Sequence, residues 1–214
     1  MYISAIIPAY NEEKTISAVI KTLKKVKDVQ EIIVVSDGSE DNTVGIAKEC
    51  GAMVINCKEN KGKAEAIREG LKVAKGDIIV LLDADLVGLS PEHVNKMIKP
   101  VIDNEVEMTI GIFDSGRFST DLAQKIAPHL SGQRALKRYI LDDIFSTEIT
   151  GYGIEIAMTE FIEQKNIKVM EVLLEEVTHI MKEEKLGLAK GFCLRMKMYW
   201  QILRVYGRLR LAKR

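Results

Sequence analysis

The sequence predicts an α/β fold with a mixed, mostly parallel sheet flanked by helices. Two observations lead to this prediction. Through the first 113 residues, short apolar segments alternate with segments of helical periodicity, and connections of a few residues join them. In addition, an unbroken apolar run from Ile78 to Leu82 ends in two carboxylates, Asp83 and Asp85. Because ligands bind at the carboxyl ends of strands in open α/β sheets, this pair marks the predicted site.

The first predicted strand covers residues 2–8 and ends at Pro8. Asn11 is expected to cap the helix that follows, because asparagine is a favourable N-cap and Glu12 and Glu13 place negative charge in the first turn. The core face of this helix is marked by apolar residues at helical spacing, namely Ile16, Val19, Ile20 and Leu23.

The same alternation continues to residue 113. The expected elements, in order, are a strand at 31–35, a turn at 36–43, a helix to Cys50, a strand at 52–56, a helix at 64–74, the strand at 78–82 and a strand at 107–113.

Beyond residue 113 the pattern is less regular. A polar loop is expected at 114–119, and residues 120–143 are expected to be mostly helical with interruptions near Pro128 and Gly132. A further helix at 154–164, two β-rich segments at 168–174 and 176–180, and a C-terminal helix from about Leu188 complete the prediction.

Composition restricts the functional class. The 214 residues suit a single domain, and the balance of 31 basic and 31 acidic residues argues against nucleic acid as a partner. Three irregularly spaced cysteines form neither a disulfide framework nor a zinc site. We expect a cytoplasmic protein, because the sequence shows no signal peptide and no apolar run of about 18 residues.

Four residues carry the chemical prediction, and each assignment has an alternative. The carboxylates of Asp83 and Asp85 suit Mg²⁺ or Mn²⁺, which can bridge a diphosphate, although they could instead cap the helix near Pro91. Asp37 is placed to bind a base or ribose, or to form a simple turn. Lys63 could meet a phosphate or a base, or could be a solvated lysine at a helix start.

The order of these motifs resembles that of the family 2 glycosyltransferases, which have the GT-A, Rossmann-like fold. The resemblance lies in four segments: residues 7–13 (IPAYNEE), 35–43 (VSDGSEDNT), 60–63 (NKGK) and 82–85 (LDAD). It implies that the nucleotide of a nucleotide-sugar donor contacts Pro8, Ala9, Tyr10, Glu12, Asp37 and Lys63. Asp83 and Ala84 would adjoin the ribose or sugar, and Asp85 would bind the metal.

The second half resembles the glucosyl-3-phosphoglycerate synthase type of enzyme in residues 131–135 (SGQRA), residues 151–156 (GYGIEI) and His179. The resemblance implies that Gly132 and Glu155 adjoin the donor sugar and the acceptor, and that His179 completes the metal site. From the residues alone, Glu155 could equally be an exposed helical acid and His179 a structural histidine.

Four basic residues are candidates for binding an anionic acceptor: Arg117, Arg134, Lys137 and Arg138. The last three could instead form one solvated helix face.

The segment 188–214 contains no acidic residue. As a helix it aligns Lys190, Lys197, Arg204 and Arg208 opposite a wide apolar arc that includes Trp200. Such a helix can lie on the inner face of an anionic membrane, pack on its own domain, or form a homodimer contact. The predicted organisation is therefore a nucleotide-sugar-binding half at 1–113, an acceptor-side half of the same domain at 114–187, and this basic amphipathic helix.

Together these features predict a metal-dependent transferase that moves glucose from UDP-glucose to an unknown acceptor. A phosphoglycerate-like acceptor with retention of configuration is the leading expectation. One alternative is an inverting transferase with a lipid-linked or polysaccharide acceptor, for which Glu155 would be the base. The other is a non-catalytic nucleotide-sugar-binding module. A nucleotidyltransferase is disfavoured, because a glycine-rich loop with arginine does not follow the first strand.

Overall fold

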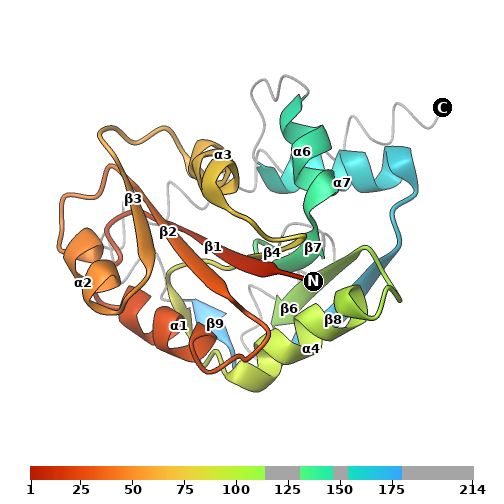
Figure 1. The fold of residues 1–214 in the computed structure, drawn as a ribbon, viewed down its shortest axis with the longest axis horizontal. Helices are drawn as coiled ribbons and strands as arrows, with labels where there is room; N and C mark the ends of the chain where they lie inside the picture. The colour runs from red at the N-terminus through yellow and green to blue at the C-terminus, as the bar shows by residue number, and fades with distance from the viewer. Residues whose placement is uncertain (114–130, 147–153, 180–214) are drawn as a thin grey trace, which may run out of the picture. The chain divides into compact units, whose positions relative to one another are not determined.

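A computed structural model describes residues 1–113, 131–146 and 154–179, and Met1–Thr178 form one compact unit. Its seven-stranded sheet has the order β3-β2-β1-β4-β7-β6-β8 (Figure 1). The strands are β1 (Ile3–Ala9), β2 (Glu31–Asp37), β3 (Met53–Cys57), β4 (Ile78–Leu81), β6 (Met108–Phe113), β7 (Arg134–Lys137) and β8 (Val169–Leu174). All neighbouring pairs are parallel except those made by β7, which confirms the predicted fold class.

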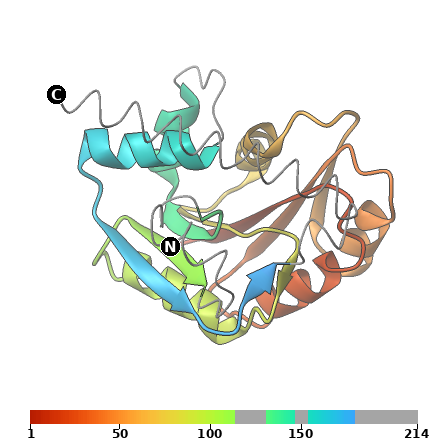
Figure 2. The ribbon, with the colours of Figure 1, turned by 180° about the vertical axis from the view of Figure 1, so that it is seen from behind.

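Helices cover both faces of the sheet, as the two opposite views show (Figures 1 and 2). The buried residues of α1 (Ile16–Leu23), α2 (Thr43–Glu49) and α4 (Pro91–Ile102) share one core cluster. Those of α3 (Lys63–Val73), α6 (Arg138–Ser146) and α7 (Ile154–Lys165) belong to a second cluster. Along β4, Ile78 and Val80 enter the first core and Ile79 and Leu81 the second, which is the alternation that a strand buried on both faces requires.

The strand β1 passes through Pro8 and ends at Ala9, whereas the sequence placed its end at Pro8. The carbonyl of Ile6 accepts a hydrogen bond from the Leu82 N–H. The backbone N–H and C=O groups of the even-numbered residues of β1 therefore face β4. The last register pair of these two strands is Ile6 with Leu81. Pro8 lies two residues later and pairs with Val35 of β2, but its missing N–H would face the β4 side, beyond the last register pair, so proline is tolerated there.

The prediction that residues 120–143 are mostly helical is wrong for Arg134–Lys137, which form β7. This strand lies antiparallel between β4 and β6, with Ala135 opposite both Val80 and Thr109. Its residues have good helical propensity, but a gap between two strands with buried faces on both sides overrides such local preferences.

Asn11 does not cap the first helix. Thr15 is the N-cap of α1, and Asn11 adopts a left-handed conformation with φ of 56°. Its side chain accepts a hydrogen bond from the Glu40 N–H (2.8 Å), and its own N–H donates to Ser39 (3.1 Å). Asn11 therefore joins the loops that follow β1 and β2.

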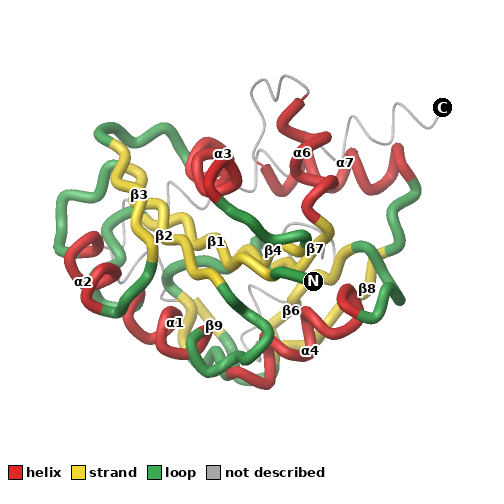
Figure 3. The backbone as a smooth tube through the Cα atoms, in the orientation of Figure 1, coloured by secondary structure: helices red, strands yellow, loops and turns green. Residues whose placement is uncertain are grey.

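A small second sheet pairs β5 (Leu86–Val87) with β9 (Thr178–His179) (Figure 3). No helix in the described ranges is long and apolar enough to cross a bilayer. The loop predicted at 114–119 and the basic helix predicted at 188–214 lie outside the described residues. The membrane, dimer and domain-boundary expectations accordingly stay predictions.

The Thr109 hydroxyl provides a test of the sheet–helix packing. It is fully buried and donates to the carbonyl of Met97 in α4 at 2.8 Å. Thr109→Val should lower the free energy of unfolding by about 1 kcal/mol, measured by urea denaturation, because the shape is kept and one buried hydrogen bond is lost. Thr22→Val, which removes a half-buried bond to Leu89, should change it by less than about 0.5 kcal/mol. Equal effects of the two variants would contradict this assignment.

Candidate functional site

Three charged side chains from distant parts of the chain meet at the carboxyl end of β4. The ammonium of Lys63, the first residue of α3, lies 2.6 Å from Asp83 Oδ1 and 2.9 Å from Glu155 Oε1. Asp83 follows β4, and Glu155 lies in the first turn of α7. The lysine side chain is 32% exposed and both acids 22%. Lys63 is thus not a solvated lysine, and Glu155 is not a freely exposed helical acid.

The charge on Lys63 is strongly favoured. Burial disfavours the ammonium, but the carboxylate of Asp83, and then that of Glu155, outweigh this effect and raise the pKa of Lys63. The cluster therefore contains a permanent cation between two acids.

Asp37 positions the loop that delivers Lys63. Its two carboxylate oxygens accept hydrogen bonds from the N–H groups of Lys61 (2.8 Å) and Gly62 (2.7 Å), and Asp37 is only 5% exposed. Gly62 has φ of 91°, a conformation that suits glycine, immediately before α3 begins. Each carboxylate oxygen keeps one further lone pair that can accept a hydrogen bond from a base or ribose. The contact of Asp37 with either group stays a prediction.

Gly132 lies against this cluster, and its predicted contact with the donor sugar stays a prediction. A Cβ atom at this position would lie 2.3 Å from the Lys63 ammonium and 2.9 Å from Asp83 Oδ2. A side chain here would push the ends of the Lys63 and Asp83 side chains from their present positions, so glycine suits this arrangement of the ion pair.

Gln133 is a site residue that the sequence analysis missed. Its amide oxygen accepts from the Asp83 N–H (2.9 Å) and its amide nitrogen donates to Asp83 Oδ2 (2.7 Å), while the side chain is fully buried. One feature of the sequence could have indicated Gln133: it is a polar amide directly after Gly132 and two residues before the apolar pair Ala135 and Leu136. The expectation of a helix here concealed that signal.

Arg134 is also fully buried, which excludes the predicted solvated helix face. Its guanidinium donates to the Ser131 carbonyl (3.1 Å) and to the Met108 sulfur (3.3 Å). Burial lowers the pKa of Arg134 to about 10, and the nearby Glu155 opposes this, so the group remains charged at neutral pH.

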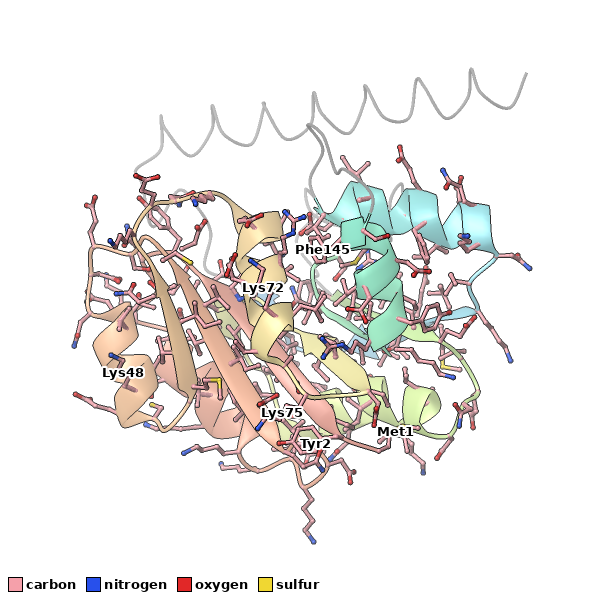
Figure 4. The ribbon with its side chains drawn as sticks, turned by 45° about the horizontal axis from the view of Figure 1, so that its top comes forward. Met1, Tyr2, Lys48, Lys72, Lys75 and Phe145 are labelled. Carbon is pink, nitrogen blue, oxygen red and sulfur yellow. The ribbon has the colours of Figure 1, made fainter. Side chains whose placement is uncertain are left out.

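Arg138 and Lys137 are engaged elsewhere. Arg138 donates to the carbonyls of Leu71 and Ala74 at the end of α3, and Lys137 donates to Asn104. A second basic residue of α3 contacts α6, because the guanidinium of Arg68 lies 5.9 Å from the ring centroid of Phe145. Figure 4 labels Phe145 on α6. These contacts support the position of α3, from which Lys63 projects.

The remaining predicted residues lie near the same sheet edge. Pro8 and Ala9 end β1, and Tyr10 follows with 46% exposure. The N–H of Glu12 donates to Thr43 (2.8 Å), and its carboxylate accepts from Thr15 (3.2 Å). The side chain of Ala84 is buried in the core.

Asp85 and His179 are the predicted metal ligands. Asp85 is half-buried directly before β5, the partner of the strand that ends at His179, whose side chain lies outside the described part of the chain. The described residues contain no group of three or more His, Cys, Asp or Glu side chains that could hold a metal. A single hard carboxylate nevertheless fits Mg²⁺ or Mn²⁺, because such ions are often held by one or two carboxylates together with a ligand's phosphates.

Comparison with known proteins identifies the class of this site. The profile of glycosyl transferase family 2 matches residues 4–157. The chain belongs to this family. The resemblance inferred from the four sequence motifs is thereby confirmed.

Several relatives are glucosyl-3-phosphoglycerate synthases. That of Petrotoga mobilis is 32% identical over 204 residues, covering 76% of this chain and 61% of the relative. The Mycobacterium tuberculosis synthase in complex with Mn²⁺, UDP-glucose and phosphoglyceric acid superposes with a TM-score of 0.70 at 28% identity, covering 84% of this chain and 71% of that one. Another of its structures, with Mg²⁺ and UDP, gives a TM-score of 0.69, again at 28% identity with 84% and 71% coverage.

The chain spans about half to three fifths of the length of the curated relatives it matches. The metals in the two solved structures are those that the sequence analysis expected.

Removal of the central cation tests the cluster. Lys63→Met should lower the free energy of unfolding at neutral pH by about 1–2 kcal/mol, because the ammonium that pairs with both Asp83 and Glu155 is lost. Lys61→Met, on the exposed neighbouring lysine, should change stability by less than about 0.5 kcal/mol. Both are measured by urea denaturation, and a Lys63 variant as stable as the wild type would show that the cluster does not depend on its cation.

Proposed function

We propose that this protein transfers glucose from UDP-glucose to a small anionic acceptor of the phosphoglycerate type, with retention, using Mn²⁺ or Mg²⁺. The observation that carries this proposal is the Lys63–Asp83–Glu155 cluster at the carboxyl end of β4. Support also comes from the related synthase that binds UDP-glucose, Mn²⁺ and phosphoglyceric acid. Family membership favours a catalyst over a non-catalytic binding module.

Different residues would contact the nucleotide and the sugar of the donor, according to their positions in the fold. The loop after β1 (Pro8, Ala9, Tyr10 and Glu12) and Asp37 would contact the nucleotide. Asp83 and Glu155 would accept hydrogen bonds from hydroxyl groups of the sugar, in an orientation set by Lys63. Gly132 would let Lys63 and Asp83 approach the chain closely beside the sugar, and Ala84 would contribute its backbone.

Asp85, with His179, would hold the metal. When bound, the ion supplies positive charge that stabilises the departing diphosphate. The protein's own contribution is then mainly to position the donor and acceptor, which is sufficient for a reaction in which charge develops on a leaving phosphate.

Thermal unfolding with ligands tests donor and metal binding. UDP with Mn²⁺ at about 100 times Kd should stabilise the wild type by about 2.7 kcal/mol, and Asp85→Ala should abolish the metal-dependent part of the shift. Asp77→Ala, before the opposite end of β4, removes a carboxylate that accepts from the Tyr2 N–H and should leave the ligand shift unchanged. If UDP gives no metal-dependent shift in the wild type, the proposal is wrong.

Catalysis is tested separately by a donor and acceptor screen read by mass spectrometry. We expect glucose transfer to phosphoglycerate or a related anionic acceptor, with an α-linked product by anomeric analysis. Binding of UDP-glucose without transfer to any acceptor would identify the protein as a binding module instead.

A further inference from the structure

The amide of Gln133 encloses one side of Asp83 with two reciprocal hydrogen bonds. The Asp83 N–H can only donate, so the atom that faces it at 2.9 Å must be the amide oxygen. The amide nitrogen is then directed at the Asp83 carboxylate, 2.7 Å from Oδ2. The side-chain orientation is therefore determined by the backbone of Asp83.

Gln133 is itself held by β6. Its N–H donates to Ser131 Oγ (3.2 Å), and its carbonyl accepts from the Gly111 N–H (2.8 Å). The Ser131 hydroxyl in turn donates to the Gly111 carbonyl (2.5 Å). The space is also tightly filled, since a Cβ at Gly111 would lie 3.1 Å from the Gln133 Cβ. A buried amide with this support has little freedom to move.

The two oxygens of the Asp83 carboxylate consequently meet different donors. Lys63 binds Oδ1 at 2.6 Å from α3, and Gln133 binds Oδ2 at 2.7 Å from the segment before β7. The Lys63 side chain is partly accessible to solvent, whereas Gln133 is fully buried. A bound ligand therefore cannot reach and displace the hydrogen bond between Gln133 and Asp83.

We propose that Gln133 is a positioning residue for sugar recognition. It holds the Asp83 carboxylate in the orientation that binds the donor's sugar and does not itself touch the donor; this inference rests on the proposed function. Glutamine suits the position because it presents an acceptor to the Asp83 N–H and a donor to Oδ2 at once. Glutamate would set a second carboxylate against Asp83, and an apolar side chain would remove both hydrogen bonds that Gln133 makes to Asp83.

The test compares binding of UDP with that of UDP-glucose, each with Mn²⁺, by isothermal titration calorimetry. The measured quantity is the ratio Kd(UDP)/Kd(UDP-glucose), which isolates the contribution of the sugar. Gln133→Met keeps the volume and should lower this ratio by about tenfold relative to the wild type, because hydrogen bonds to charged groups have effects of this order. The Kd for UDP should stay within about twofold. Gln133→Glu keeps the acceptor but removes the donor, and should lower the ratio at least as much.

Two comparisons separate positioning from general destabilisation. Thr109→Val removes a buried hydrogen bond from the neighbouring strand β6 and should leave the ratio unchanged. Asp83→Ala should lower the ratio, and adding Gln133→Met to it should cause no further loss, because Gln133 acts through Asp83. A cooperative thermal unfolding transition shows that each variant is folded. If Gln133→Met does not fold, Gln133→Glu provides the result.

The outcomes distinguish this inference from the proposed function. A wild type that binds neither UDP nor UDP-glucose overturns both. A wild type that binds both, with Gln133 variants that keep its ratio or lose both affinities equally, overturns the positioning role alone. A further loss from Gln133→Met in the Asp83→Ala background also overturns it.

Discussion

The candidate site depends on the ammonium of Lys63 held between two carboxylates. Asp83 follows β4 and Glu155 lies in α7, and both carboxylates pair with the same ammonium, so without it their like charges would repel. The cation comes from a third element, α3, whose start is set by the contact of Asp37 with two backbone N–H groups. The ion pairs of Lys63 with Asp83 and Glu155 therefore link α3 and α7 to the end of β4.

Most of the fold could be predicted because its strands are buried on both faces. Runs such as Ile78–Leu81 have a clear apolar signature, and the short connections between strands and helices indicate parallel pairing. The strand β7 could not be predicted in this way. It is four residues long, carries two basic residues, and is defined by its neighbours β4 and β6 rather than by its own pattern. Local sequence contains little information about such a partner.

The site was predictable to a similar extent. The motifs named Lys63, Asp83, Gly132 and Glu155 as site residues, and the structure places the four together, while their contacts with a donor stay predictions. Gln133 was missed because its role depends on a pairing between segments 50 residues apart. Asn11 was misassigned as a helix cap for a related reason, since its side chain and N–H bond to a loop that is distant in sequence. Residue type indicates which chemistry is available, whereas tertiary contacts decide where it is used.

The position of β7 also has a consequence for the order of assembly. Strands β1 to β4 can pair with one another as soon as residue 81 has been synthesised, but β6 pairs only with β7 and β8, which come later. In a chain that is still being synthesised, β4 would therefore be an edge strand. Asp83 at its end would lack the hydrogen bonds to the Gln133 side chain. Insertion of β7 covers that edge and delivers Gln133 in the same event. We expect the step that covers the β4 edge to be also the step that brings Gln133 to Asp83, whereas β8 and the Glu155 of α7 join from later parts of the chain.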